Sequence, residues 1–365
     1  MRVVIAPDSF KGSARAADAA EAIADGWRSV RPRDDLLLLP QADGGEGTLD
    51  AIAPAVAGAR FHELEVTGPD DRPVTARWLE LPGGEAVVEL AESSGLPLMA
   101  RLDPLGATTF GLGEVIGSAL DAGAMSLVIG LGGSASTDGA AGALQALGLR
   151  LLDAAGAPLR RGGGALAALA AVDRTGLRPA PHRVRLLTDV DNPLLGPRGA
   201  AAVYAPQKGA GPAEVAELES ALTAWSAKLG GDPGLAGAGA AGGAAFGFST
   251  AWGAEIVPGA PAIAELTGLI AAAADADLVI LGEGGFDHTS LGGKVVGHAL
   301  GIAGAGTQVV VIAGRVDAVP VLPGGRAAAS ISLSDLAGSP EVAQRDALAW
   351  LVRAGAIAAD RIGPR

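Results

Sequence analysis

Short apolar runs alternate with longer amphipathic patterns along most of this sequence. The runs have the length of buried strands, and strands are expected at 2–6, 36–39, 127–129, 149–152, 184–187, 278–281, 308–312 and 328–331. Apolar positions at helical spacing predict helices at about 13–30, 109–120, 213–229 and 262–274, and from 340 onwards. Strands that alternate with helices favour an α/β fold built on parallel sheet.

Residues 61–90 follow a different pattern. Three short strands are expected at 61–66, 74–79 and 86–90, separated by turn residues at 68–71 and 82–84. Such a meander is typical of a mixed sheet, and a length of 365 residues is enough for two domains. We therefore predict a Rossmann-like parallel α/β/α domain formed by 1–60 and 270–365, and a second mixed-sheet α/β domain formed by 61–269. The site is expected in the cleft between the two domains.

Composition and charge exclude several classes of function. The net charge is −13 and only 3% of the residues are aromatic, so a nucleic-acid partner, which requires a basic face, is not expected. The chain has no cysteine, which excludes disulfides and thiolate chemistry. No apolar stretch is long enough to span a bilayer, and the N-terminal apolar run is too short for a signal peptide. The sequence thus predicts a cytoplasmic protein without a membrane partner.

Acids, hydroxyls and glycines follow the predicted strands where each strand ends. These loops begin near Asp8, Asp43, Gly132, Asp189 and Glu283. The carboxyl ends of parallel strands share one edge of a sheet, where α/β proteins bind their ligands. One of these loops, 282–285, is glycine-rich, and we expect positive φ angles or a close backbone approach there. The glycine-rich tract 230–248 has few polar residues and is expected to be a buried loop or helix start beside a ligand.

Lysine is rare and concentrated in these loops. The chain contains only four lysines, and three of them (Lys11, Lys208 and Lys294) lie next to glycine. Lysine is a compact point charge that suits phosphate oxygens, whereas arginine forms a planar fork. Together with the acids, these lysines indicate a site for a metal-bound polyphosphate.

Two other classes of enzyme fit single segments of the chain. The run Gly130 to Ala135 follows a strand and matches G-x-G-x-x-A, with Asp153 near the spacing of a ribose-binding acid, so an NAD-dependent dehydrogenase is one alternative. Asp189-Val190-Asp191 after a strand is similar to the nucleophile motif of haloacid-dehalogenase-type phosphatases, although Asn192-Pro193 follows it. The same two acids are equally suitable Mg²⁺ ligands.

Six collinear motifs resemble the bacterial type of the glycerate kinase family that begins with APDSFKGS. The chain reads APDSFKGS at 6–13, ADGGEGT at 42–48, GGSASTDGA at 132–140, DVDNPL at 189–194, PQKGA at 206–210 and GEGGFDHTSLGGK at 282–294. This resemblance implies ATP-dependent phosphorylation of D-glycerate to 2-phosphoglycerate, with ATP and Mg²⁺ as cofactors. A homodimer is a possible assembly.

The motifs assign roles to individual residues. The expected catalytic residues are Asp8, Lys11, Asp43, Asp191 and Lys294, with Asp8 or Asp43 as the base and Lys11 and Lys294 on phosphate oxygens. Asp189 and Asp191 are expected to bind Mg²⁺. The expected substrate- and nucleotide-binding residues are Ser9, Gly44, Gly45, Glu46, Gly132, Gly133, Ser134, Asp138, Asn192, Lys208, Glu283, Asp287 and Ser290.

One motif departs from the family pattern. The family has an amide followed by threonine where this chain has Thr289 and Ser290. The hydroxyl is kept and the amide is lost, so a kinase for a related hydroxy acid and a non-catalytic sugar-acid binding protein are both alternatives.

Overall fold

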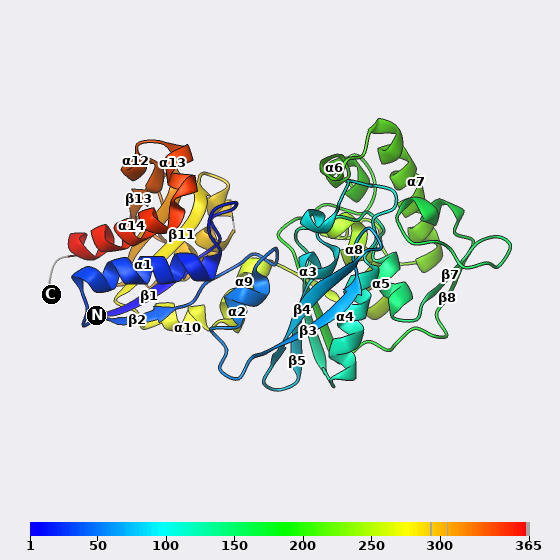
Figure 1. The fold of residues 1–365 in the computed structure, drawn as a ribbon, viewed down its shortest axis with the longest axis horizontal. Helices are drawn as coiled ribbons and strands as arrows, with labels where there is room; N and C mark the ends of the chain where they lie inside the picture. The colour runs from blue at the N-terminus through cyan, green and yellow to red at the C-terminus, as the bar shows by residue number, and fades with distance from the viewer. Residues whose placement is uncertain (293, 305, 363–365) are drawn as a thin grey trace. The chain divides into compact units, whose positions relative to one another are not determined.

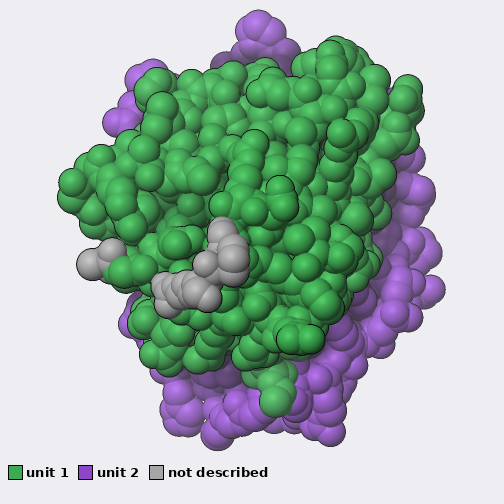
Figure 2. Space-filling view, turned by 90° about the vertical axis from the view of Figure 1, so that its left-hand side faces the viewer, with its two compact units in different colours: residues 1–43, 50–57, 260–365 green, residues 44–49, 58–259 purple. Residues whose placement is uncertain are grey.

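The computed structural model describes residues 1–292, 294–304 and 306–362. The chain forms two compact units, coloured separately in Figure 2: unit 1 comprises 1–43, 50–57 and 260–365, and unit 2 comprises 44–49 and 58–259. The sequence had predicted the boundaries at 60/61 and 269/270. Within the described residues, no helix is both long and apolar enough to cross a membrane.

Unit 1 is built on a five-stranded parallel sheet in the order β13-β12-β11-β1-β2. The strands are β1 (Arg2–Pro7), β2 (Asp35–Leu38), β11 (Leu278–Phe286), β12 (Gln308–Val316) and β13 (Ala329–Ser332). Alternate side chains enter two different cores, Val3 and Ile5 on one face and Val4 and Ala6 on the other. Both faces are therefore buried, which confirms the predicted α/β/α sandwich.

Helices cover each face of this sheet. One core contains α1 (Ala16–Val30), α12 (Leu333–Ala337), α13 (Pro340–Arg345) and α14 (Ala347–Arg361), and the other contains α9 (Gly259–Leu266), α10 (Leu269–Ala274) and α11 (Val295–Ile302). In Figure 1 the blue α1 lies beside the red α14, although the two helices are at opposite ends of the chain. The short α2 (Thr48–Ile52) lies where the chain passes between the units.

The contact between α1 and α14 depends on glycine in both helices. A Cβ added at Gly26 would overlap the carbonyl oxygen of Val352, and one added at Gly355 would overlap that of Ile23. Backbone carbonyls cannot rotate away as a flexible side chain can, so the helices would have to separate.

We expect Gly26→Ala to lower the free energy of unfolding by at least about 2 kcal/mol because of this overlap. Gly301→Ala is the matched control, since an added Cβ at this helical position meets no atom within 4 Å and should raise stability by up to about 1 kcal/mol. Thermal unfolding of both variants checks this. Equal melting temperatures would contradict the close packing.

Two predictions for the loops of unit 1 differ in part from the structure. The glycines at 282–285 lie inside β11 and have no positive φ. The other predicted alternative, a close backbone approach, is confirmed, because a Cβ at Gly314 of β12 would overlap the carbonyl of Gly284. Helix α1 begins at Ala16, not at Ser13, whose hydroxyl donates to the carbonyl of Phe10 within the preceding turn.

Unit 2 contains a six-stranded mixed sheet in the order β10-β9-β6-β5-β4-β3. Its strands are β3 (Arg60–Thr67), β4 (Pro73–Leu81), β5 (Glu85–Glu89), β6 (Ser126–Gly130), β9 (Arg183–Leu187) and β10 (Glu255–Val257). The pairs β3–β4 and β4–β5 are antiparallel and the others are parallel. The predicted meander at 61–90 and the mixed sheet are both confirmed.

Helices and a small hairpin complete unit 2. The helices are α3 (Leu90–Ser94), α4 (Phe110–Asp121), α5 (Ala141–Ala146), α6 (Ala200–Tyr204), α7 (Pro212–Leu229) and α8 (Ala240–Trp252), with 3₁₀ turns at Leu96–Leu98, Gly164–Ala168 and Pro206–Lys208. A further 3₁₀ turn, Ser290–Gly292, belongs to unit 1. The strand predicted at 149–152 is β7 (Arg150–Leu152), which pairs with β8 (Ala171–Asp173) outside the main sheet.

The glycine-rich tract forms a strained turn at the start of α8. Ala241, Gly242 and Gly243 all have positive φ, and Ala140 in the facing loop does as well. A Cβ at Gly242 would overlap the carbonyl of Ser136. The expectation of a buried, close-packed helix start is confirmed for 237–248, which is held tightly against residues 136–140, whereas 230–236 is mostly exposed.

Candidate active site

A cavity of about 390 Å³ lies in unit 1 at the carboxyl ends of β1, β11 and β12. Six of the residues predicted for the site line it: Asp8, Ser9, Lys11, Asp43, Glu283 and Lys294. The parallel register explains this, because Pro7 of β1 pairs with Gly282 of β11, which places the following loops side by side. Residues from loops about 275 positions apart in the chain thus share one cavity.

Asp8 has the most perturbed environment in this cavity. Burial and, to a smaller extent, the neighbouring Asp43 carboxylate raise the pKa of Asp8 from 3.8 to about 7. A hydrogen bond of 2.6 Å from the Ser9 amide and the charge of Lys11 act in the opposite direction. A carboxyl group with a pKa of about 7 can accept a proton and release it again near neutral pH, as a general base must.

Glu283 and Lys294 lie at the β11 end of the cavity. Burial raises the pKa of Glu283, while a hydrogen bond from Ser290 and the charge of Lys294 lower it. Lys294 precedes α11 and its ammonium lies 3.3 Å from the hydroxyl of Thr289. The cavity therefore combines hydrogen-bond acceptors with cations, which is the combination that a hydroxylated anion requires.

Asp287 and Ser290 organise the loop between these two residues. The Asp287 carboxylate accepts hydrogen bonds from the Thr289 amide at 2.7 Å and the Thr289 hydroxyl at 2.6 Å. Both bonds lower the pKa of Asp287, and the bond from the Thr289 hydroxyl has the larger effect. Ser290 is buried and its hydroxyl accepts from the Asp287 amide. Both predicted binding residues thus shape the loop that carries Lys294.

Unit 2 brings two of the glycine motifs together. The Gly132 amide donates to the carbonyl of Gly44 at 3.0 Å, and a Cβ at Gly132 would overlap the Cα of Gly45. Gly133 has φ +76° and lies against the Glu46 side chain. Five residues predicted for binding (Gly44, Gly45, Glu46, Gly132 and Gly133) therefore lie in adjoining loops at the ends of β6 and β9.

Glu89 at the end of β5 positions this cluster and was missed by the sequence reasoning. Its carboxylate is 3% exposed and accepts from the amides of Gly47 at 3.0 Å and Leu49 at 3.2 Å. The only sequence signal was an acid at the end of an apolar strand, where a buried charge is costly unless it is hydrogen-bonded.

Ser134, Asp138 and Lys208 form a buried polar group behind these loops. Lys208 donates to the hydroxyl of Ser134 at 2.8 Å and to the carbonyl of Ser136 at 2.5 Å. Asp138 is fully buried and accepts from the amide and hydroxyl of Thr109. Burial raises the pKa of Asp138, and these bonds oppose the shift.

The two predicted metal ligands, Asp189 and Asp191, are exposed beyond the end of β9. Asp189 accepts from the Gly259 amide at 2.9 Å, and Asp191 pairs with Arg198 at 3.0 Å. The neighbouring Asn192 side chain bonds Tyr204 and the Arg198 carbonyl. No group of three or more acidic or histidine side chains among the described residues could hold a metal ion alone. Carboxylate oxygens on the surface suit an Mg²⁺ ion that keeps water and phosphate ligands.

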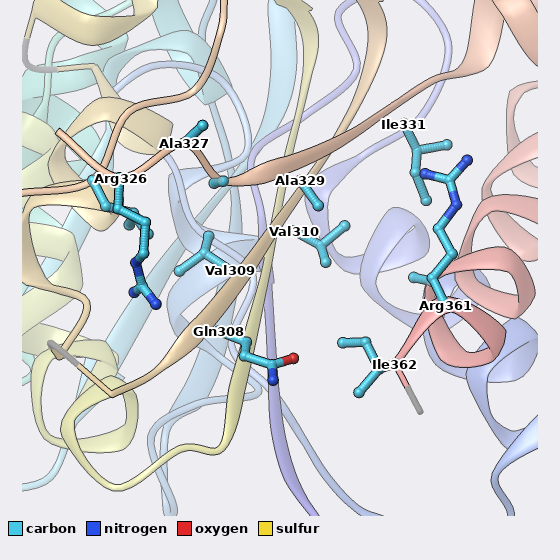
Figure 3. Close-up of a pocket in the computed structure, with 12 residues that line it drawn as sticks. Gln308, Val309, Val310, Arg326, Ala327, Ala329, Ile331, Arg361 and Ile362 are labelled. Atoms are coloured by element: carbon cyan, nitrogen blue, oxygen red, sulfur yellow. The ribbon is translucent and has the colours of Figure 1, made fainter. Parts of the chain in front are cut away.

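A second cavity, of about 260 Å³, lies at the other end of β12 (Figure 3). Its lining includes Gln308, Val309, Arg326 and Arg361. Arg326 donates to the Thr307 carbonyl at 2.8 Å. None of the residues predicted for the site lines this cavity, and it lies at the amino ends of the strands, away from the edge where parallel sheets bind ligands.

The local structure argues against the dehydrogenase alternative. A dinucleotide fingerprint needs a helix directly after its glycines, but α5 begins only at Ala141. Asp153 accepts from the amides of Ala155 and Ala157 in the β7–β8 turn, which explains an acid at this position without a ribose.

The α/β fold, the charged cavity of unit 1 and the glycine loops of unit 2 are typical of an enzyme that handles a small anion together with a phosphate-bearing ligand. A model of the glycerate kinase family matches residues 3–362. "Glycerate kinase" of Bacillus subtilis (strain 168) is 44% identical over 87% of this chain and 85% of its own length. "Glycerate 2-kinase" of Escherichia coli (strain K12) is 41% identical over 81% of this chain and 80% of its own length. A crystal structure from Salmonella typhimurium LT2, assigned as a glycerate kinase 2, aligns with a TM-score of 0.83 and 38% identity over 99% of this chain and 98% of that one. The chain belongs to the glycerate kinase family.

Proposed function

We propose that this protein transfers the γ-phosphoryl group of ATP to the C2 hydroxyl of D-glycerate and produces 2-phosphoglycerate. The observation that carries the proposal is Asp8, a carboxyl group with a pKa of about 7 in a cavity that also contains Lys11 and Lys294. Phosphoryl transfer needs a positioned proton acceptor and cations that stabilise developing charge. The C2 position follows the named activity of the Escherichia coli relative.

Each group in the unit 1 cavity has a distinct role in this proposal. The Asp8 carboxylate accepts the proton of the C2 hydroxyl as its oxygen forms the bond to the γ-phosphorus and the bond to ADP breaks. Asp43 and Glu283 accept hydrogen bonds from substrate hydroxyls, and Lys11 and Lys294 bind carboxylate or phosphate oxygens. Ser9 fixes the Asp8 side chain through its amide.

The loops of unit 2 are proposed to bind the nucleotide phosphates. Gly133 is exposed and left-handed, and the loops 44–46 and 132–134 pack against each other beside it. Asp189 and Asp191 would hold Mg²⁺, which neutralises phosphate charge when it is bound. Asn192 is assigned to the support of this acidic loop.

The direct test is ADP release from Mg·ATP with and without D-glycerate, with the position of the phosphate read by phosphorus NMR. Glycerate-dependent ADP with phosphate on C2 is expected. ADP release only with another hydroxy acid would favour a related kinase, and ligand binding without turnover would favour a sugar-acid binding protein. The change at Thr289 and Ser290 makes ADP release with another hydroxy acid the first alternative to examine, because the amide found in the family is absent here and substrate contacts can differ.

Replacement of Lys11 gives a separate test of the cavity. Lys11 is an exposed side chain that lines it, so Lys11→Met should preserve the fold and lower kcat/KM for D-glycerate about 100-fold by removal of a charged hydrogen bond. Lys228→Met, on the surface of α7, is the matched control and should keep wild-type kinetics. Unchanged kinetics in Lys11→Met would remove Lys11 from the site.

We also propose a cellular location and an assembly for this enzyme. ATP and glycerate are metabolites of the cytoplasm, so we place the enzyme there. A homodimer is proposed, and sedimentation analysis of the full chain tests it.

A further inference from the structure

Lys208 is the most buried of the cations near the site. The residue is 2% exposed and lies at the end of the 3₁₀ turn Pro206–Lys208. Burial lowers the pKa of Lys208 to about 7, and the charge of Asp138 opposes this shift. A buried amine without a task would be costly, and apolar residues would fill the space more favourably. The arrangement therefore calls for an explanation beyond packing.

The two hydrogen bonds of Lys208 both end on the loop 131–139. Its ammonium donates to the Ser134 hydroxyl at 2.8 Å and to the Ser136 carbonyl at 2.5 Å. With 2% of its surface exposed, the side chain contacts these groups and has almost no surface left for a substrate. Any effect on the reaction must therefore pass through the loop.

The loop is held on its other sides as well. Asp138 accepts from the Thr109 amide at 2.8 Å and the Gly142 amide at 3.2 Å. Gly139 donates to the Gly242 carbonyl and accepts from the Trp225 indole, both at 3.0 Å. The left-handed residues of the α8 turn face the same segment. A loop fixed this firmly can hold a hydroxyl group in one direction.

The chemistry of the Lys208–Ser134 bond sets that direction. The protonated amine of Lys208 only donates, so in this form the Ser134 oxygen must accept, and the hydroxyl hydrogen of Ser134 points to another partner. A donor polarised by a neighbouring cation binds an anion more strongly than an isolated hydroxyl does. Ser134 follows directly after Gly133, the exposed left-handed residue of the proposed phosphate loop.

We propose that Lys208 is a positioning residue: it fixes the loop 131–139 and turns the Ser134 hydroxyl into a dedicated donor to a phosphate oxygen of the nucleotide. This inference rests on the proposed kinase function. It assigns Lys208 to a role behind the site, whereas the motif alone predicted contact with the substrate or the nucleotide.

The test is a double-mutant cycle of Lys208→Met and Ser134→Ala in the full chain, with Lys228→Met as the control for the loss of a lysine. We expect Lys208→Met to lower kcat about 100-fold and Ser134→Ala to lower it about 30-fold, the range for loss of an oriented donor. The KM for D-glycerate should stay within about threefold of wild type, since that ligand is assigned to unit 1. The kcat of the double variant should lie within about threefold of that of Lys208→Met alone, because both substitutions remove the same oriented hydroxyl donor.

The outcomes separate the two proposals. The role of Lys208 would be overturned if the loss of kcat in the double variant equalled the product of the two single losses. It would also be overturned by full turnover in Ser134→Ala, whether or not Lys208→Met folds well. A wild-type protein that releases no ADP with D-glycerate would overturn the proposed function instead. In that case calorimetric titration with Mg·ATP decides the role of Lys208: about tenfold weaker binding by Ser134→Ala supports it, and equal affinity overturns it.

Discussion

Asp8→Asn is expected to lower kcat/KM for D-glycerate by about 10³-fold, the size of a general-base contribution. Asparagine keeps the shape of the side chain but cannot accept the proton of the substrate hydroxyl. Asp25→Asn, an exposed position on α1, is the control and should keep wild-type rates. Steady-state kinetics with both substrates varied would measure the effect, and a loss below tenfold would move the role of base to Asp43.

The pH profile gives an independent reading of the same residue. Because the base must be deprotonated and the pKa of Asp8 is about 7, log kcat/KM should rise with unit slope below pH 7 and level off above it. This rising part of the pH profile should be absent in Asp8→Asn. An unchanged rise in that variant would assign the titration to another group.

As pH rises, the contribution of Asp8 to folding stability should fall while its contribution to activity increases. The unfolded chain releases the Asp8 proton near pH 4, while the folded chain retains it up to a pKa of about 7. The contribution of this group to folding therefore falls as pH rises through that interval. We expect Asp8→Asn to melt at the same temperature as wild type or higher at pH 8. A large loss of stability would mean that the carboxylate is structural.

The second large effect is expected at Asp138, where Asp138→Ala should destabilise the protein by about 3–5 kcal/mol. The substitution leaves the donors of Thr109 and Gly142 without their acceptor and removes the charge that favours protonation of Lys208. Buried donors without partners are the costly outcome.

Asp232→Ala is the matched control for this prediction. Asp232 is exposed and its carboxylate accepts from the amide of Gly234 in the same turn, so its loss should cost less than about 1 kcal/mol. Calorimetric unfolding of both variants measures the difference. Similar melting temperatures would show that the buried carboxylate is not essential to unit 2.

The periodicity of the sequence was sufficient for many of the longer elements but not for short ones such as β8, β10 and α6, which it did not predict. The strands expected at 2–6, 127–129 and 184–187 and the helix expected at 213–229 agree with β1, β6, β9 and α7 to within one or two residues. Burial on both faces of a parallel sheet produces apolar runs that need no tertiary information to recognise. The errors occurred where glycine was interpreted as a turn, as in β11, because sequence does not distinguish positive φ from close approach to a neighbouring strand.

The α/β class, the positions of the acid and lysine loops and the family could all be inferred from the sequence, since apolar spacing and motif order are local properties of the chain. Which of those residues lie together in space depends on the folded structure. The pKa of Asp8 depends on enclosure and on Asp43 and Glu283, which are distant in the chain, and the burial of Lys208 depends on a loop more than 70 residues before it. Electrostatic interactions act over a few ångströms in space, so the chemistry of a site is set by neighbours that the order of residues does not reveal.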